Sequence, residues 1–147
     1  MESTWNEQII AHYKSNTIQF DWLSKPSQHQ FRWRTFEGRW VTSKRRIRNH
    51  ETLMKAIGKK FPSDLYVSTS SWLNPVELPR LRDTETSYPI LIDHLIVFDI
   101  DVALLSLKNL EKARNIAKGV HSFVMENESV EFVHATFSGS KGFHLIY

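Results

Sequence analysis

The residues best suited to chemistry are two aspartates, Asp99 and Asp101, which end the run Leu-Ile-Val-Phe-Asp-Ile-Asp over residues 95–101. Alternate side chains of a β-strand share a face, so both carboxylates point one way and Ile100 points the other way. Neighbouring like charges repel each other, and a cation between them removes that repulsion. Carboxylate pairs suit Mg²⁺ or Mn²⁺, which also bind substrate phosphates. A pattern this short also occurs at strand ends and turns that have no function.

A second cluster, Ser-Gly-Ser-Lys-Gly-Phe-His at 138–144, combines turn-forming glycines with groups that bind phosphate. Glycines let the backbone turn tightly and approach a ligand, and amides exposed in such a turn bind anions. The candidate phosphate contacts are Ser138, Ser140, Lys141 and His144. A strand is expected after this turn, whereas a P-loop opens a helix. The structural alternative to a phosphate site is an ordinary hairpin turn with a lysine on its surface, followed by a histidine that serves only the sheet.

Positive charge is concentrated in residues 1–60, which carry a net charge of +7, whereas residues 61–147 carry −4. Aromatic residues alternate with the basic ones. Phosphates attract cations and unpaired bases stack on flat rings, so this pattern indicates a nucleic-acid surface. A solvated strand face with its aromatic residues packed inward explains the pattern equally well. The candidate contacts are Arg32, Arg34, Lys44, Arg45, Arg46 and Arg48.

Composition narrows the class of protein. The chain has 147 residues, of which 41% are hydrophobic and 24% charged, enough for one domain with a core. Its longest apolar runs fall short of the roughly 20 residues that span a bilayer, and its first residues lack a signal-peptide profile. The absence of cysteine excludes disulfides, zinc–Cys sites and a thiol nucleophile. We expect a cytosolic protein without a membrane partner.

Hydrophobic periodicity predicts helices over residues 4–15 and 50–60 and a long helix that ends near residue 127. Asn49 and Ser106 are the expected capping residues of the second and third helices. The second half of the chain then has the order strand, helix, strand, turn, strand. The expected strands are 31–36, 39–42, 64–68, 90–100, 130–137 and 143–147.

The motifs Phe-Asp-Ile-Asp at 98–101 and Phe-Ser-Gly-Ser-Lys-Gly-Phe-His at 137–144 resemble the first two motifs of the archaeo-eukaryotic primase superfamily. Residues 61–68 and Asn74-Pro75 are similar to the segment before the first motif in catalytic primase subunits. The second motif also resembles the polymerase domain of bacterial end-joining ligases. The resemblance covers roughly residues 60–147.

The resemblance implies one α+β primase–polymerase catalytic domain over residues 1–147. Its approximate halves would be a basic N-terminal α/β unit over 1–89 and a partial RNA-recognition-like βαββ unit over 90–147 with a mostly antiparallel sheet.

The family also implies roles for individual residues. Asp99 and Asp101 would be the catalytic ligands of Mg²⁺ or Mn²⁺, while Ser138, Ser140, Lys141 and His144 would hold a nucleoside triphosphate. A 3′-hydroxyl would attack the α-phosphate and release pyrophosphate. The basic N-terminal residues would face single-stranded or primed DNA, and a primase large subunit is an implied partner. The expected location is the cytoplasm, in association with the nucleoid, or the nucleus if the protein is eukaryotic.

The sequence departs from the family pattern in two ways. The family has a further metal-binding carboxylate beyond its second motif, whereas this chain stops at Tyr147. The cysteine cluster of many replicative primases is absent. We therefore expect a catalytic domain truncated after its second motif, with weak or no polymerisation by this chain alone.

Three other classes stay open. One is a non-catalytic nucleic-acid-binding fragment of such a protein. Another is a haloacid-dehalogenase-type phosphatase with Asp99 as its nucleophile, which is disfavoured because no aspartate follows Asp101. The third is an assembly fragment whose aromatic residues are all core.

Overall fold

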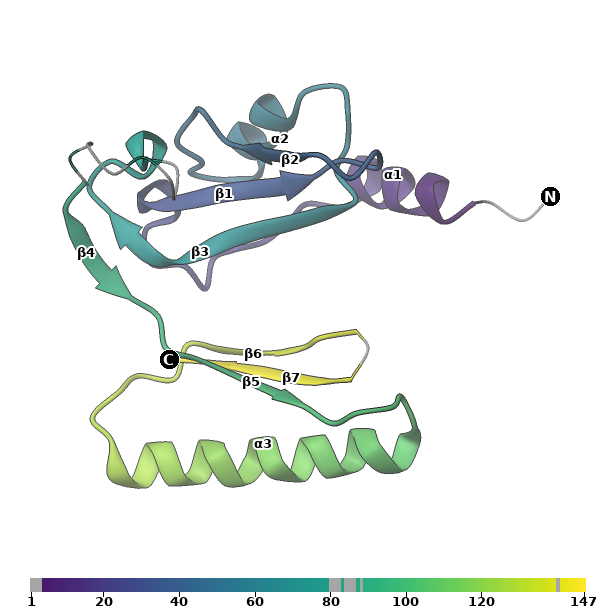
Figure 1. Cartoon of the computed structure of the whole chain (residues 1–147), viewed down its shortest axis with the longest axis vertical. Coiled ribbons are helices and arrows are strands. Elements are labelled where there is room, and N and C mark those ends of the chain that lie inside the picture. The colour runs from purple at the N-terminus through teal and green to yellow at the C-terminus, as the bar shows by residue number, and fades with distance from the viewer. Residues whose placement is uncertain (1–3, 80–82, 84–86, 88, 140) are drawn as a thin grey trace. The chain divides into compact units, whose positions relative to one another are not determined.

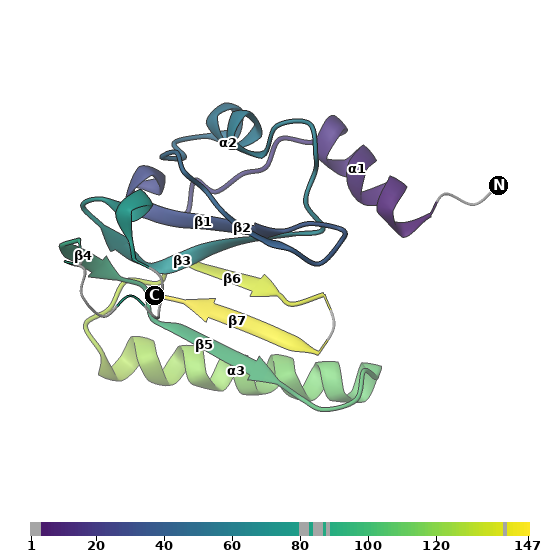
Figure 2. The same cartoon turned by 45° about the horizontal axis from the view of Figure 1, so that its top comes forward.

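The computed structural model describes residues 4–79, 83, 87, 89–139 and 141–147. The chain divides into two compact units, Met1–His94 and Leu95–Tyr147, each built around its own antiparallel sheet (Figure 1 and, turned, Figure 2). The α+β class predicted from the sequence is confirmed. The boundary follows His94 instead of residue 89, because the last strand before it pairs within the sheet of the first unit.

Among its described residues, the first unit contains two α-helices and a four-stranded sheet of order β2-β1-β3-β4. All neighbouring strands in this sheet are antiparallel. Two short 3-10 helices, η1 (Pro26–Gln28) and η2 (Pro75–Glu77), lie in its connections. The other elements are α1 (Trp5–Ser15), β1 (His29–Arg34), β2 (Trp40–Thr42), α2 (His50–Ile57), β3 (Asp64–Trp72) and β4 (Leu91–His94).

Local sequence explains where the helices of the first unit begin and end. Thr4 and Glu7 form a capping box that opens α1, and the Asn49 side chain accepts the Thr52 amide at the start of α2. Such caps satisfy amide groups that the first helical turn leaves unpaired. α2 ends at Ile57, before the predicted residue 60, because Gly58 adopts a φ of 73° that breaks the helix.

Strand β1 separates aromatic from basic side chains. Phe31 and Trp33 are buried, whereas Arg32 and Arg34 are exposed on the other face. The Phe20 ring lies 5.4 Å from that of Phe31. At these two aromatic positions the inward-packing alternative is therefore correct.

The second unit is a helix packed on a three-stranded sheet of order β5-β7-β6. Its chain order confirms the predicted βαββ arrangement, and β7 pairs antiparallel with both neighbours. Ser106 caps the helix as predicted, because its side chain accepts the Asn109 amide. The elements are β5 (Val97–Asp101), α3 (Leu107–Asn127), β6 (His134–Phe137) and β7 (Gly142–Ile146).

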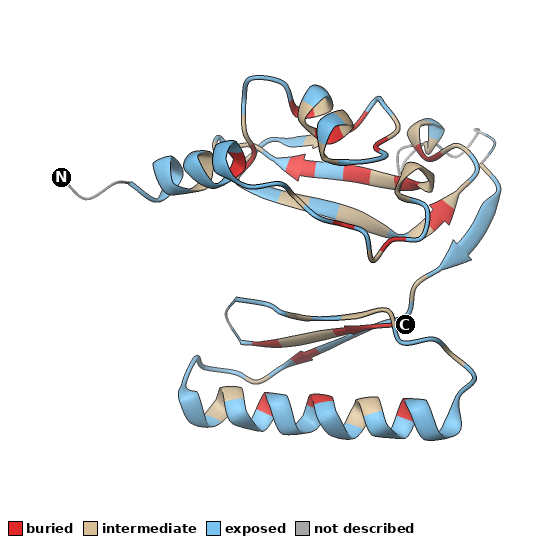
Figure 3. Cartoon of the chain, turned by 180° about the vertical axis from the view of Figure 1, so that it is seen from behind, coloured by how far each residue is buried: buried red, intermediate tan, exposed pale blue. Residues whose placement is uncertain are grey.

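The core of the second unit lies between α3 and the sheet. The buried positions of the helix are on the side turned towards the strands, and its outer side is exposed (Figure 3). Apolar residues at helical spacing therefore form the stripe that the sequence predicted. The core residues are Ile100, Ala117, Val124, Leu145 and Tyr147.

Three predicted strands differ strongly from the structure, whereas the bounds of the other three shift by only one or two residues. The single strand expected over 90–100 is wrong: β4 and β5 are separate strands in separate sheets. Strand β3 continues past residue 68 to Trp72, because β4 pairs with its far end. Strand β6 begins at His134, later than the predicted residue 130. An apolar run marks extended backbone, but it does not reveal which partner each stretch will find.

Candidate metal and nucleotide site

The two aspartates lie on the face of the β5 sheet opposite the core. Ile100 is buried against α3, and alternation along the strand turns Asp99 and Asp101 to the other side. The Asp99 side chain is 66% exposed, so its carboxylate is open to a ligand. This orientation is the one that the sequence predicted.

Strand β7 brings the second motif against the first. Asp99 pairs with His144 and Asp101 pairs with Gly142 in the antiparallel register of β5 and β7. Across this ladder His144 Nε2 lies 3.4 Å from Asp99 Oδ1. The two motifs therefore meet both in the backbone register and in a side-chain contact.

The histidine also reaches the third strand of the sheet. Thr136 on β6 pairs with His144, and the Thr136 hydroxyl lies 3.3 Å from His144 Nδ1. Asp99, His144 and Thr136 therefore form a row across all three strands, which holds the imidazole from both sides. Sequence reasoning missed Thr136, because its role depends on the pairing of β6 with β7 and not on a motif.

Because Gly142 has no side chain, the Ile100 backbone and the Asp101 carboxylate can lie close to it. A Cβ built on this glycine would lie 1.7 Å from the Ile100 carbonyl oxygen and 2.8 Å from Asp101 Oδ1. A real Cβ cannot come that close to a backbone oxygen. Glycine at this position is therefore required for the observed β5–β7 contact and for the position of the Asp101 carboxylate over β7.

The turn before β7 is stabilised by its own serine. Ser138 Oγ accepts the backbone amides of Lys141 (3.2 Å) and Gly142 (3.1 Å). The sequence predicts that the amides of this turn bind an anion. For Lys141 and Gly142 this expectation is wrong, because both amides donate to Ser138 Oγ. The hydroxyl of Ser138 keeps its own hydrogen for donation, and Lys141 is exposed. Ser140 lies outside the described residues.

The donor set fits a hard divalent cation that shares its coordination with a substrate. Asp99 and Asp101 supply carboxylate oxygens on one face, and Mg²⁺ and Mn²⁺ prefer such ligands. Among the residues that the structure describes, no group of three or more His, Cys, Asp or Glu side chains is arranged to hold a metal. An ion on this pair would take its remaining ligands from water and phosphate.

The predicted nucleic-acid contacts all belong to the first unit. Five of them are exposed, whereas Arg46 is half-buried. The Arg46 guanidinium donates to the Leu73 carbonyl oxygen (2.7 Å) and to Asn74 Oδ1. Arg46 therefore ties the segment after β2 to the segment after β3. The five exposed residues are Arg32, Arg34, Lys44, Arg45 and Arg48.

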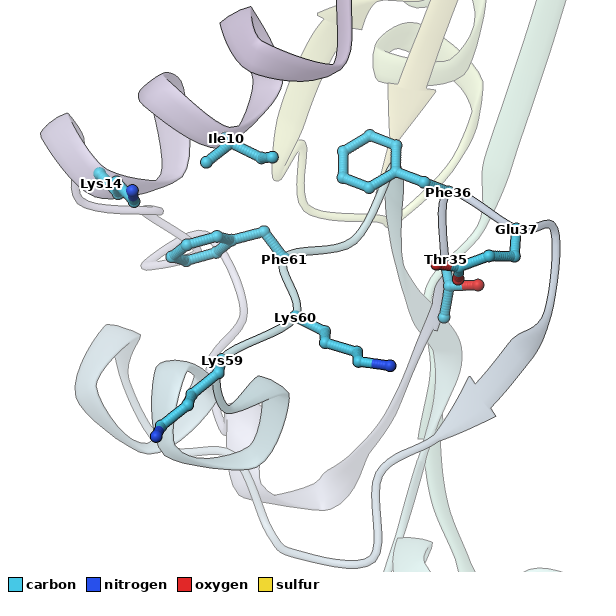
Figure 4. Close-up of a pocket in the computed structure, with 8 residues that line it drawn as sticks. All are labelled: Ile10, Lys14, Thr35, Phe36, Glu37, Lys59, Lys60 and Phe61. Carbon is cyan, nitrogen blue, oxygen red and sulfur yellow. The ribbon is translucent and has the colours of Figure 1, made fainter.

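A pocket of about 320 Å³ lies within the first unit, between α1, the β1–β2 turn and the segment after α2. Its walls combine phenylalanine rings with lysines (Figure 4). Lys60 extends towards the turn that carries Glu37, whereas Lys59 extends away from it. A hydrogen bond from the Thr35 side chain, aided by Lys60 and Arg39, lowers the pKa of Glu37. All residues that line this pocket belong to the first unit, whereas the motif residues belong to the second.

No protein-family model matches this chain, and no curated protein is significantly similar to it. Within the part of the chain that the structure describes, no helix combines the length and the apolar character needed to cross a bilayer.

Proposed function

We propose that the chain carries the nucleotidyltransferase site of a primase–polymerase, which joins a nucleotide to a nucleic-acid or nucleotide hydroxyl. The observation that carries the proposal is the 3.4 Å contact between His144 Nε2 and Asp99 Oδ1 across β5 and β7. It links an acidic pair that suits a divalent cation to the strand that follows a turn whose residues suit phosphate. The resemblance of both motifs to the archaeo-eukaryotic primase superfamily supports the same function.

Asp99 and Asp101 are the residues that would hold Mg²⁺ or Mn²⁺. Bound there, the ion would stabilise negative charge on the transferred phosphate. Lys141 contributes a positive charge and Ser138 a hydroxyl donor to the triphosphate oxygens. His144 lies on the same face of the sheet as Asp99, with its Nε2 beside the Asp99 carboxylate and its Nδ1 beside the Thr136 hydroxyl.

In the proposed reaction the oxygen of a 3′-hydroxyl bonds to the α-phosphorus of a nucleoside triphosphate. The bond from that phosphorus to the β-phosphate oxygen breaks, so pyrophosphate leaves with its electron pair. The hydroxyl proton passes to solvent. The contribution of the chain is to hold the triphosphate and to offset its charge, which are the main requirements of phosphoryl-type transfer.

The partners that follow are nucleoside triphosphates and single-stranded or primed DNA, with a primase large subunit as a further partner. The location that suits this function is the cytoplasm, in association with the nucleoid, or the nucleus if the protein is eukaryotic. Basic residues of the first unit supply the charge that DNA binding requires.

The deciding experiment measures binding, which does not depend on turnover. Titration calorimetry with a nucleoside triphosphate, with and without Mn²⁺, would compare the parent chain with an Asp99→Asn, Asp101→Asn double variant. We expect metal-dependent binding by the parent and a loss of at least roughly tenfold in the variant, because each carboxylate is a ligand. A Glu126→Gln, Glu128→Gln variant removes two exposed charges from the same unit and should bind like the parent.

Two results would overturn the proposal. One is a double variant that binds nucleotide and metal as tightly as the parent chain does. The other is a phosphorylated Asp99 after incubation with an aryl phosphate, which would identify a phosphatase of the haloacid-dehalogenase type.

A further inference from the structure

Two aromatic side chains meet on the exposed face of the first sheet. Trp40 begins β2 and Tyr66 lies on β3, with β1 between these strands. Their ring centroids are 5.0 Å apart and the rings are inclined by 50°. They therefore meet over the middle strand, although neither strand pairs with the other.

Both rings remain open to solvent. Trp40 is 52% exposed and Tyr66 is 47% exposed, while Phe31 and Trp33 on the opposite face of β1 are buried. Scattered exposed aromatic residues are normal in proteins. A pair in mutual contact is different, because its rings are held in place before a ligand arrives and less conformational entropy is lost on binding.

Arginines flank this pair. The Arg32 guanidinium carbon lies 5.0 Å from the centroid of the Trp40 ring, within cation–π distance. In the register of the sheet Arg32 pairs with Tyr66, and Arg34 pairs with Trp40. Four residues from three strands thus form one patch, which we call the aromatic–arginine patch: Arg32, Arg34, Trp40 and Tyr66.

Charge identifies the class of ligand. Residues 1–60 carry a net charge of +7 and the whole first unit, residues 1–94, carries +4, so the unit attracts a polyanion. An acidic residue, Asp64, also lies on this face, where it pairs with Arg34 and accepts the Ser63 hydroxyl. The favourable contact with a phosphate is therefore centred on Arg32, away from Asp64. Exposed rings next to arginines suit unpaired bases, whereas bases inside a duplex are already stacked.

We propose that the aromatic–arginine patch binds single-stranded nucleic acid, with an unpaired base stacked on Trp40 and Tyr66 and the flanking phosphate on Arg32. The patch adds a stacking site that the basic residues alone do not provide. It requires no metal, nucleotide or catalysis, so it holds or fails separately from the proposed nucleotidyl transfer.

The test measures binding of a fluorescent oligothymidylate by anisotropy, with the full chain and without divalent metal. Trp40→Ala and Tyr66→Ala should each weaken binding by roughly tenfold, which lies within the range for loss of one stacked base. Trp5→Ala is the matched control, because Trp5 on α1 is 73% exposed and lies outside the patch. It should leave the affinity within about twofold of the parent value. Trp40→Phe keeps a ring and should retain most of the affinity.

Salt dependence separates stacking from charge. Trp40→Ala should leave the slope of log affinity against log salt unchanged, whereas Arg32→Gln should reduce its magnitude by about one. The Asp99→Asn, Asp101→Asn variant should bind the oligonucleotide like the parent, whatever its effect on nucleotide binding. A Trp40→Ala loss no larger than that of Trp5→Ala would overturn the proposal.

An oligonucleotide with abasic sites tests the same idea on the ligand and needs no protein variant. The parent chain should bind the abasic strand more weakly than the normal strand by roughly the factor that Trp40→Ala costs. Trp40→Ala should show little further loss on the abasic strand. Equal binding of both strands by the parent would overturn the stacking role, even if the protein variants failed to fold.

Discussion

Asp101 on β5 pairs with Gly142 on β7, and a methyl group on that glycine would lie 2.8 Å from the Asp101 carboxylate oxygen and 1.7 Å from the carbonyl oxygen of Ile100. Asp101 and Gly142 can therefore lie this close only because one of the two residues lacks a side chain. Gly142 is buried and lies beside the candidate site.

Gly142→Ala should separate β5 from β7. The added carbon has no space beside the backbone, so the second unit should lose about 3 kcal/mol of unfolding free energy, at the upper end for overpacking. Urea unfolding followed by circular dichroism measures this loss. Gly119→Ala is the control, because nothing lies within 4 Å of a Cβ at this helical position and alanine is the better helix former. It should raise stability by about 0.5–1 kcal/mol. Similar destabilisation by both variants would contradict the role of close strand approach.

Lys141→Ala should weaken triphosphate binding while leaving nucleoside binding nearly unchanged, since the ammonium group would contact phosphate and not the base. Lys118→Ala removes an exposed lysine from α3 and serves as its control. Calorimetry with a nucleoside triphosphate and with the matching nucleoside separates the two effects. Equal loss for both ligands would show that Lys141 supports the turn and does not bind phosphate.

Arg45→Gln should change nucleic-acid affinity, whereas Arg46→Gln should change the stability of the fold. Arg45 is exposed, so its loss should lower single-strand affinity and salt dependence without changing the melting temperature. Arg46 donates to the Leu73 carbonyl and to the Asn74 side chain, so its loss should lower unfolding free energy by about 1–3 kcal/mol. Thermal melts and oligonucleotide anisotropy on both variants give the comparison. An Arg46 variant with a parental melting temperature and reduced DNA affinity would reverse this assignment.

Tyr13→Phe should reduce the loss of stability at alkaline pH. Burial, with a contribution from Asp64, raises the pKa of the Tyr13 phenol above its ordinary value near 10. The folded state then binds the phenolic proton more tightly than the unfolded chain does. Its stabilising contribution is complete below about pH 10 and is lost as the pH rises through the raised folded value.

Phenylalanine at this position keeps the ring that stacks on Phe61 at 5.7 Å but cannot ionise. Urea unfolding at several pH values between 8 and 11 should give a shallower decline for the variant. Some decline should remain, because burial also raises the pKa of Tyr147. Identical slopes for the parent chain and the variant would contradict the Tyr13 assignment.

Features that depend on nearby residues could be read from the sequence. Asn49 and Ser106 were identifiable as caps because a cap needs only its own side chain and the amides that follow. The apolar stripe of α3 and the shared face of Asp99 and Asp101 follow from backbone periodicity alone. The βαββ order of the second unit was equally accessible, since it needs only the succession of elements.

Features that depend on strand partners could not be read in that way. The run from Ile90 to Ile100 is mostly apolar and is typical of one extended segment, yet β4 and β5 hydrogen-bond within different sheets. Thr136 joins the site only because β6 pairs with β7. Trp40 and Tyr66 meet only because β1 holds their strands on either side of it.

The sequence by itself thus determined the chemical groups, the helices and the faces of individual strands. Tertiary structure decided which strands are neighbours, and thereby that Asp99 lies beside His144 and Trp40 beside Tyr66. The physical reason is the range of the interactions involved. Caps and periodicity act within a few residues, whereas strand pairing depends on hydrogen bonds and packing between segments that are distant in the chain.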